Sequence, residues 1–279
     1  MNFRRLSSRA TVAAASTALA AGSVLAIAPA ANAVEVSNTY TCAAAGLYSG
    51  NFPLTVNGGF PEQYYAGATV PADTLKALAT ATVPEDARGL LQLAQIESAR
   101  ADDFAFDLGG NSVPMPAAGD FSDDYSTWNG AAGNAKFVTP APGTYTVTMP
   151  EAFTLTTVNA GGDSAVLDCT LAEGQEAASL GQTTLLKQSA TVTAPKSVKA
   201  KKGTVAKVKV SVAGEAGPVA GKVVALKGKK TLGSAKLKAG KAVISLGKLP
   251  VGKHKVTIKY AGNKSVNGDT AKTVVKVVR

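Results

Sequence analysis

Carboxylates are the side chains of this chain most able to do chemistry, and they concentrate between Asp102 and Trp128. They form two clusters, namely Asp102, Asp103 and Asp107, followed by Asp120, Asp123 and Asp124. A pair of carboxylates could act as acid and base on a glycoside, with Tyr125 and Trp128 stacking against the sugar. Alternatively, oxygens converging from one loop could bind Ca²⁺, and the second cluster is the weak calcium candidate.

The spacing of these aspartates matches neither an EF-hand loop nor a hydrolase signature, which favours a solvated acidic loop. Nucleophilic catalysis has less support, because the chain has one histidine and lacks a Gly-x-Ser-x-Gly motif. That histidine, His254, shares strand parity with Val256 and Ile258, which indicates a structural residue at the edge of a core. We therefore expect no catalytic residue, no cofactor and no metal. An enzyme that uses Asp102 to Trp128, either carbohydrate-active or calcium-dependent, is the alternative.

The first 33 residues have the three parts of a secretory signal peptide. Arginines at positions 4, 5 and 9 precede a run rich in Ala, Val and Leu, and Ala31-Asn32-Ala33 forms a small-x-small cleavage site. The Arg4-Arg5 pair by itself leaves the export route open. No later window approaches ~18 consecutive apolar residues, so we expect an exported protein without a transmembrane anchor after cleavage.

Two cysteines, Cys42 and Cys169, are the only ones in the chain. In an exported protein, two cysteines most simply form one disulfide, and their wide spacing does not suit zinc binding or a redox motif. The bond would close a loop of 127 residues. The chain-entropy account of disulfides then suggests a stabilisation on the order of 4–5 kcal/mol.

Charge divides the rest of the chain into two parts. Residues 34–186 hold seventeen acidic and four basic residues, a net charge of −13. Residues 187–279 hold twenty-two basic and two acidic residues, a net charge of +20. We predict a signal peptide, an acidic disulfide-containing domain, a linker and a basic domain. Their bounds are 1–33, 34–181, 182–189 and 190–279.

Alternating apolar and polar residues predict strands in the acidic domain. These are Glu35–Cys42, Pro53–Val56, Gly143–Met149, Ala152–Val158 and Ser164–Leu171. Two stretches rich in Ala and Leu follow acidic or capping residues and predict short helical insertions, Pro71–Ala79 and Pro84–Ile96. The disulfide would then join an early strand to a late one.

The basic domain alternates lysines with aliphatic residues and breaks at glycines, which predicts seven short strands. They are Ala190–Ala194, Thr204–Val212, Lys222–Lys227, Thr231–Leu237, Ala242–Leu246, Lys253–Tyr260 and Lys272–Val278. Seven strands in about 90 residues are typical of an immunoglobulin-like sandwich. The expected fold is therefore mainly β, with two β-sandwich-type domains, the C-terminal one immunoglobulin-like.

Both parts also resemble known families. The segments Thr39-Tyr40-Thr41-Cys42, Pro142-Gly143-Thr144-Tyr145 and Asp168-Cys169-Thr170 resemble an uncharacterised family of secreted actinobacterial two-cysteine β domains. The segments from Pro218 to Leu226 and from Leu249 to Gly262 resemble the bacterial Ig-like repeat. That resemblance implies a spacer or adhesive domain at the cell surface, without enzyme activity or fixed ligand residues.

The lysines of the basic domain have two interpretations. They keep the domain soluble and protect its edge strands, or they bind an anionic polymer such as a wall polymer or glycan. Eight lysines are the candidates for polyanion binding, Lys207, Lys209, Lys227, Lys229, Lys230, Lys253, Lys255 and Lys259. The near absence of Arg, and a single aromatic residue in the domain, argue against specific nucleic-acid recognition. Opposite charges on the two domains also allow self-association.

These observations predict a secreted, non-catalytic interaction or structural protein, either free or held non-covalently at the cell envelope. Its rivals are the enzyme described above and a soluble spacer without a polyanion partner. The three differ in whether the chain associates with envelopes at low salt and in whether it hydrolyses a substrate.

Overall fold

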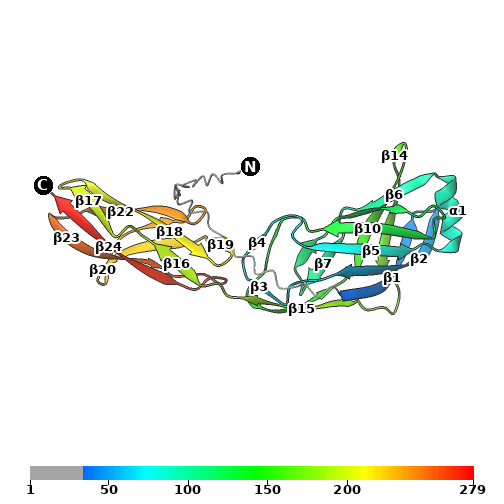
Figure 1. Cartoon of the computed structure of the whole chain (residues 1–279), viewed down its shortest axis with the longest axis horizontal. Helices are drawn as coiled ribbons and strands as arrows, with labels where there is room; N and C mark the ends of the chain where they lie inside the picture. Colours follow the sequence, from blue (N-terminus) through cyan, green and yellow to red (C-terminus); the bar gives the residue numbers. More distant parts are fainter. Residues whose placement is uncertain (1–33) are drawn as a thin grey trace, which may run out of the picture.

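The computed structural model describes residues 34–279 as two strand-rich domains arranged end to end (Figure 1). The predicted signal peptide, residues 1–33, lies outside the described residues. The predicted mainly β fold, with an immunoglobulin-like C-terminal domain, is confirmed. Among the described residues, no helix is both long enough and apolar enough to span a membrane.

The N-terminal domain contains one helix and fifteen strands. Their bounds are β1 (Val34–Ala44), β2 (Tyr48–Gly58), β3 (Gln63–Tyr65), β4 (Thr69–Val70), β5 (Lys76–Thr82), α1 (Glu85–Leu93), β6 (Ile96–Ala101), β7 (Ala105–Leu108), β8 (Ser112–Pro114), β9 (Ala117–Phe121), β10 (Thr127–Gly133), β11 (Phe137–Val138), β12 (Gly143–Thr148), β13 (Ala152–Asn159), β14 (Gly162–Leu171) and β15 (Ser179–Leu186). Four of the five predicted strands fall within these elements, and the fifth, Gly143–Met149, runs one residue past the end of β12.

Eight of these strands close into an antiparallel barrel in the order β1-β14-β13-β6-β9-β10-β5-β2. Closure leaves this sheet without an exposed edge. Inward positions such as Tyr40, Leu54 and Val56 are buried and alternate with outward ones along their strands. A second sheet, β3-β15-β12-β7-β8, lies between the barrel and the C-terminal domain (Figure 1). Its buried side chains, including Phe106 and Val147, extend the barrel core.

The predicted helix over Pro71–Ala79 is wrong. A turn leads instead into strand β5, in which Ala77 and Ala79 are buried while Lys76 and Leu78 are exposed. Alanine favours helices, but that preference is worth less than 1 kcal/mol per residue, and pairing with β2 on one side and β10 on the other outweighs it. The second predicted helix is confirmed as α1, which has acidic residues in its first turn.

The C-terminal domain is a sandwich of two sheets. Its strands are β16 (Ala190–Thr193), β17 (Ser197–Lys201), β18 (Val205–Gly214), β19 (Gly217–Pro218), β20 (Lys222–Lys227), β21 (Lys230–Lys236), β22 (Lys241–Lys248), β23 (Gly252–Tyr260) and β24 (Asp269–Val278). One sheet has the order β16-β18-β19 with β22 also paired to β18, and the other has the order β17-β24-β23-β20-β21. Val208 and Ile244 of the first sheet and Ile258 and Val275 of the second are fully buried in a shared core.

The joint between the domains is shorter than predicted. Residues 182–186, expected in the linker, are part of β15, because Thr183 and Leu185 alternate inward and the strand pairs with β12 and β3. Gln188 follows and is only 3% exposed. Its side-chain N–H donates to Ala66 O of the N-terminal domain at 2.7 Å, and its backbone N–H donates to Ser265 O of the C-terminal domain at 2.9 Å.

Candidate functional sites

The first aspartate cluster serves the local structure. Asp102 forms an ion pair with Arg100 at 3.0 Å. Both carboxylate oxygens of Asp103 accept a hydrogen bond from the backbone N–H of Thr154, at 2.9 and 3.1 Å. The Asp107 carboxylate accepts the N–H of Gly110, which has a positive φ in the turn between β7 and β8. Each of the three carboxylates therefore has a structural partner of its own.

The second cluster surrounds the β9–β10 turn. Asp124 accepts hydrogen bonds from the Ser122 hydroxyl at 2.7 Å, from the Ser126 hydroxyl at 2.7 Å and from the Ser126 backbone N–H at 3.0 Å. These donors stabilise the charged carboxylate and lower the pKa of Asp124 to about 2. Within residues 34–279, no three His, Cys, Asp or Glu side chains gather closely enough to hold a metal ion. The arrangement is that of a capped turn.

Trp128 does not lie beside these carboxylates. Asp120 pairs in register with Asn129 on the outside of the barrel, whereas Phe121 pairs with Trp128 on the inside. Trp128 is only 6% exposed. Trp128 therefore does not supply the sugar platform that the alternative enzyme hypothesis requires, because residues adjacent along a strand point to opposite faces.

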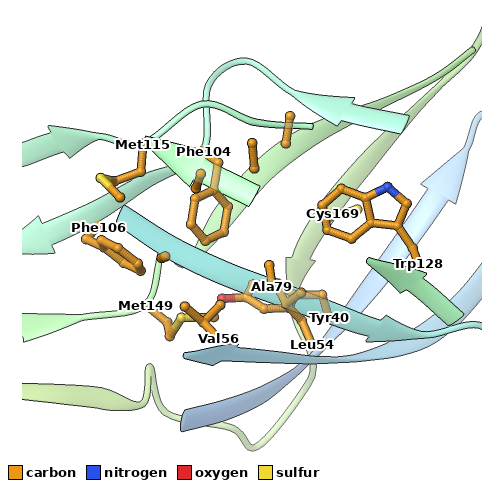
Figure 2. Close-up of a cluster of buried hydrophobic side chains, with 14 of the residues drawn as sticks. Tyr40, Leu54, Val56, Ala79, Phe104, Phe106, Met115, Trp128, Met149 and Cys169 are labelled. Atoms are coloured by element: carbon orange, nitrogen blue, oxygen red, sulfur yellow. The ribbon is translucent and has the colours of Figure 1, made fainter. Parts of the chain in front are cut away.

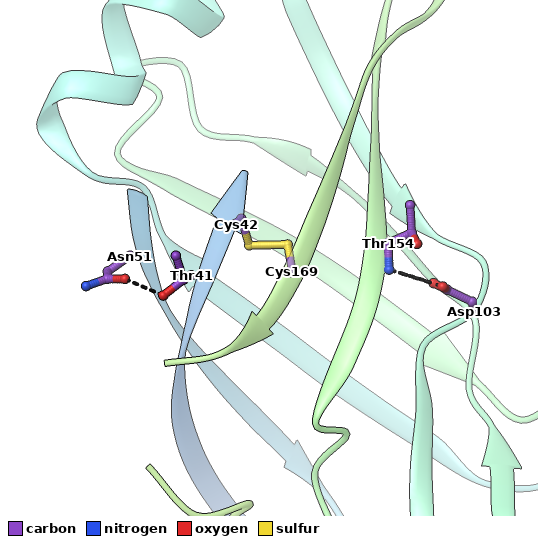
Figure 3. Close-up of a disulfide and its surroundings, with 6 residues drawn as sticks. All are labelled: Thr41, Cys42, Asn51, Asp103, Thr154 and Cys169. Atoms are coloured by element: carbon purple, nitrogen blue, oxygen red, sulfur yellow. Dashed lines mark hydrogen bonds between the residues drawn. A yellow bond between two sulfur atoms is a disulfide. The ribbon is translucent and has the colours of Figure 1, made fainter. Parts of the chain in front are cut away.

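The predicted disulfide between Cys42 and Cys169 is confirmed. The two residues face each other in register on the neighbouring strands β1 and β14 (Figure 3). Both are buried and point toward the barrel interior. The bond therefore closes a 127-residue loop at a seam of the barrel.

His254 has a structural role in the sandwich. It is buried on β23, its Nε2 donates to Pro250 O at 2.7 Å, and its Nδ1 lies 3.2 Å from the ammonium of Lys227. The carbonyl can only accept, so the tautomer with the proton on Nε2 fits both contacts.

The eight candidate lysines do not form one patch. Lys207 and Lys209 lie on β18, in one sheet, while Lys253, Lys255 and Lys259 lie on β23, in the other. The remaining three surround the turn between β20 and β21 and are Lys227, Lys229 and Lys230. Two sheets that pack face to face turn their outer surfaces in opposite directions. The structure thus divides the candidates between two faces of the sandwich.

A row of three lysines, of which the sequence analysis named only Lys253, crosses the second sheet. Lys199 of β17 pairs in register with Lys276 of β24, and Lys276 pairs with Lys253 of β23. All three alternate with inward residues, so they share the outer face. The ion pairs found among residues 34–279 all belong to the N-terminal domain, so none of them neutralises this row.

A cavity of about 380 Å³ inside the barrel was also missed by the sequence analysis. Apolar side chains line it almost completely, and Figure 2 shows several of them, with the Trp128 indole among them. A signal was present in the sequence, because alanines recur at alternate positions in β5, where Ala77, Ala79 and Ala81 face inward. Because the sequence analysis assigned Ala77 and Ala79 to a helix, it did not place these small side chains along one wall of an interior.

Together, the barrel, its disulfide and the appended sandwich define a modular β protein. The chain belongs to the family of unknown function DUF6801, whose model matches residues 39–181. Residues 190–279 match the bacterial Ig-like domain (group 3). Both resemblances expected from the sequence are confirmed. No curated protein matches the chain.

The solved structures that match this chain do so with low similarity. Fibronectin(III)-like modules of CbhA from Clostridium thermocellum are 17% identical, with 80% of this chain and 94% of that chain covered and a TM-score of 0.25. A putative membrane anchored protein from Corynebacterium diphtheriae is 17% identical, with 88% and 59% covered and a TM-score of 0.35. These scores are too low to indicate a shared function.

Proposed function

We propose that this chain is a secreted, non-catalytic interaction protein whose Ig-like domain binds anionic polymers of the cell envelope. Bacterial Ig-like domains are typically non-catalytic, and the disulfide suits an oxidising compartment outside the cytoplasm. The charge of the domain also supports the proposal, since residues 187–279 contain twenty-one lysines and one arginine but only two acidic residues.

The observation that carries the proposal is the row of Lys199, Lys276 and Lys253. Like charges directly opposite each other destabilise a sheet, so solubility alone would be served better by lysines placed apart. Two steps between neighbouring strands place the outer ammonium groups roughly 10 Å apart. A polymer with repeated phosphate or carboxylate groups can contact all three at once and relieve their repulsion. A small anion would contact only one or two.

Lysine also indicates the kind of recognition. An ammonium group is a compact point charge without the planar fork of arginine, so it attracts anions without imposing bidentate geometry. Binding should therefore depend on charge density and spacing along the polymer, and it should weaken as salt screens the contact.

The test is sedimentation of the chain comprising residues 34–279 with isolated cell envelopes across a salt series. The variant with Lys199→Gln, Lys253→Gln and Lys276→Gln should release at lower salt, and its salt slope should fall by about 2 to 3. A matched control carries Lys207→Gln, Lys209→Gln and Lys241→Gln, which removes the same charge from the opposite sheet. Equal losses in both variants would mean that net charge alone acts. No pelleting of the unsubstituted chain at low salt would refute envelope binding.

A further inference from the structure

The barrel is a container with unfilled space. An eight-stranded barrel is just wide enough to be filled by its own side chains or to hold one small ligand. Here about 380 Å³ stays open inside, within the rough range of 300–1,000 Å³ seen for small-molecule sites. Unfilled space in a core lowers stability. A cavity of this size therefore needs either an occupant or a reason to be maintained.

The cavity exists because inward positions on one wall of the barrel carry the smallest side chains. Neighbouring strands β6, β9, β10 and β5 contribute these residues. They are Ala101, Ala117, Ala132, Ala77, Ala79 and Ala81. Larger residues such as Phe153 and Leu167 line the wall formed by β13 and β14. The resulting space has predominantly apolar walls, which suits an aliphatic chain.

One buried polar atom of a residue that lines the cavity has no hydrogen-bond partner. The indole Nε1 of Trp128 is the buried side-chain nitrogen or oxygen that makes no hydrogen bond among the described residues. Three hydroxyls that line the cavity have partners, since that of Tyr40 donates to Pro150 O at 2.7 Å, that of Tyr48 to Asp86 at 3.1 Å and that of Thr157 to Ala165 O at 3.1 Å. An indole N–H can only donate. The group that completes it must bring a hydrogen-bond acceptor.

The cavity opens at the end of the barrel covered by α1. Leu47, in the β1–β2 turn, lines the cavity and is 80% exposed, and Leu93 of α1 lines it and is 83% exposed. Ala87 is the single residue of α1 that is buried, so the helix rests on the opening through few side chains. This end of the barrel points away from the Ig-like domain (Figure 1).

The lack of basic side chains around the cavity narrows the class of ligand that can bind. No Lys, Arg or His side chain lines the cavity. A buried carboxylate would therefore lose its hydration without gaining a counter-ion, which costs several kcal/mol. An ester, ether or alcohol oxygen can accept the Trp128 N–H without that loss.

We propose that the barrel binds one neutral lipid with an aliphatic chain, which enters at the α1 end and accepts a hydrogen bond from Trp128 through an uncharged oxygen. This site goes beyond the proposed function, because it lies in the other domain and involves none of its lysines. The exposed leucines at the opening would contact the lipid as it enters.

The experiment titrates residues 34–279 with methyl decanoate and follows tryptophan fluorescence. Trp128 is the only tryptophan in the chain, so the emission reports on the cavity directly. We expect a saturable shift of the emission to shorter wavelength, and a much weaker response to the decanoate anion. Absence of a saturable response to methyl decanoate would overturn the proposal.

Two variants test the location and the hydrogen bond. Ala79→Leu narrows the cavity from inside and should weaken binding, whereas Leu78→Met, on the outer face of the same strand, should leave it unchanged. By calorimetry, Trp128→Phe should weaken methyl decanoate binding roughly 3- to 10-fold more than it weakens binding of 1-undecene, which has no acceptor and loses only the apolar contact. Thermal unfolding checks that each variant is folded. If Ala79→Leu is unfolded, Ala101→Leu replaces it. Unchanged binding in a folded cavity-filling variant would place the ligand elsewhere and refute the site.

Discussion

Both domains are built from strands in which inward and outward residues alternate, but the interior of one is packed and the interior of the other contains a cavity. In the Ig-like domain the inward positions carry branched side chains such as Val208, Ile244 and Ile258, which fill the space between the sheets. In the barrel many inward positions carry alanine, and a cavity stays open. The size of inward side chains, rather than the strand pattern, therefore decides whether a β domain is a packed core or a container.

The disulfide, which belongs to the barrel and has no counterpart in the Ig-like domain, gives the largest expected effect on stability. Replacing Cys42 and Cys169 by alanine should destabilise the barrel by on the order of 4 kcal/mol, because the unfolded chain regains the freedom of a 127-residue loop. Differential scanning calorimetry should show one transition moving to lower temperature while that of the Ig-like domain stays in place. Two transitions that move together would show that the domains unfold as one unit, and the contrast between them would then fail.

A matched pair of substitutions tests the contrast between container and core directly. Ala225→Leu places a larger side chain into the fully buried core of the Ig-like domain and should cost roughly 1–3 kcal/mol. Ala79→Leu places the same side chain into the barrel cavity, where space is available, and should cost less than about 1 kcal/mol or stabilise. Chemical unfolding of both variants measures the difference. Equal losses of unfolding free energy in the two variants would mean that the barrel has no free space for the larger side chain.

Acid should destabilise the barrel more than the Ig-like domain, with a smaller effect than the substitutions above. Asp124 has a folded pKa of about 2, below the value of about 3.9 for an unperturbed aspartate. Its contribution is therefore present above pH ~4 and is lost as the pH falls toward 2. The Arg100 guanidinium lowers the pKa of Asp163 and acts in the same direction.

The barrel transition should accordingly move to lower temperature between pH 4 and pH 2, and Asp124→Asn should reduce that dependence. The Ig-like domain, with two acidic residues, serves as the internal control in the same scan. An unchanged pH dependence in the variant would remove Asp124 as its source.

The opposite charges of the domains lead to the smallest expected effect. We propose weak head-to-tail association at low salt, because the net charges are −13 for residues 34–186 and +20 for residues 187–279. Sedimentation velocity should show a concentration-dependent increase in mass at about 10 mM salt that disappears at about 150 mM, where the screening length falls to roughly 8 Å. A single monomeric species at both salt concentrations would exclude it.

Much of the fold could be predicted from local patterns. Alternation revealed the strands that carry both cysteines, and the acidic start of α1 marked its first turn. Barrel closure could not be predicted, because it depends on which distant strands pair, as β6 does with both β9 and β13. The helix expected at Pro71–Ala79 failed for the same reason, since its partners β2 and β10 lie elsewhere in the chain.

The candidate sites were less accessible to sequence reasoning. Parity identifies lysines on one face of a strand, but only the register of β17, β24 and β23 reveals that Lys199, Lys276 and Lys253 form a row. The unpaired indole of Trp128 depends on what surrounds it inside the barrel. Each of these sites arises from pairing between segments that no local pattern connects.

Gln188 gives the molecule a mechanical property. Its side-chain oxygen accepts the Ala216 N–H at 3.0 Å and its backbone oxygen accepts the Asn267 N–H at 2.8 Å, in addition to its bond to Ala66. Gln188 thereby links Ala66 of the N-terminal domain to two segments of the C-terminal domain, which restrains rotation about the joint. If the Ig-like domain holds the protein at the envelope, as proposed, a restrained joint keeps the α1 end of the barrel on the side away from that surface (Figure 1).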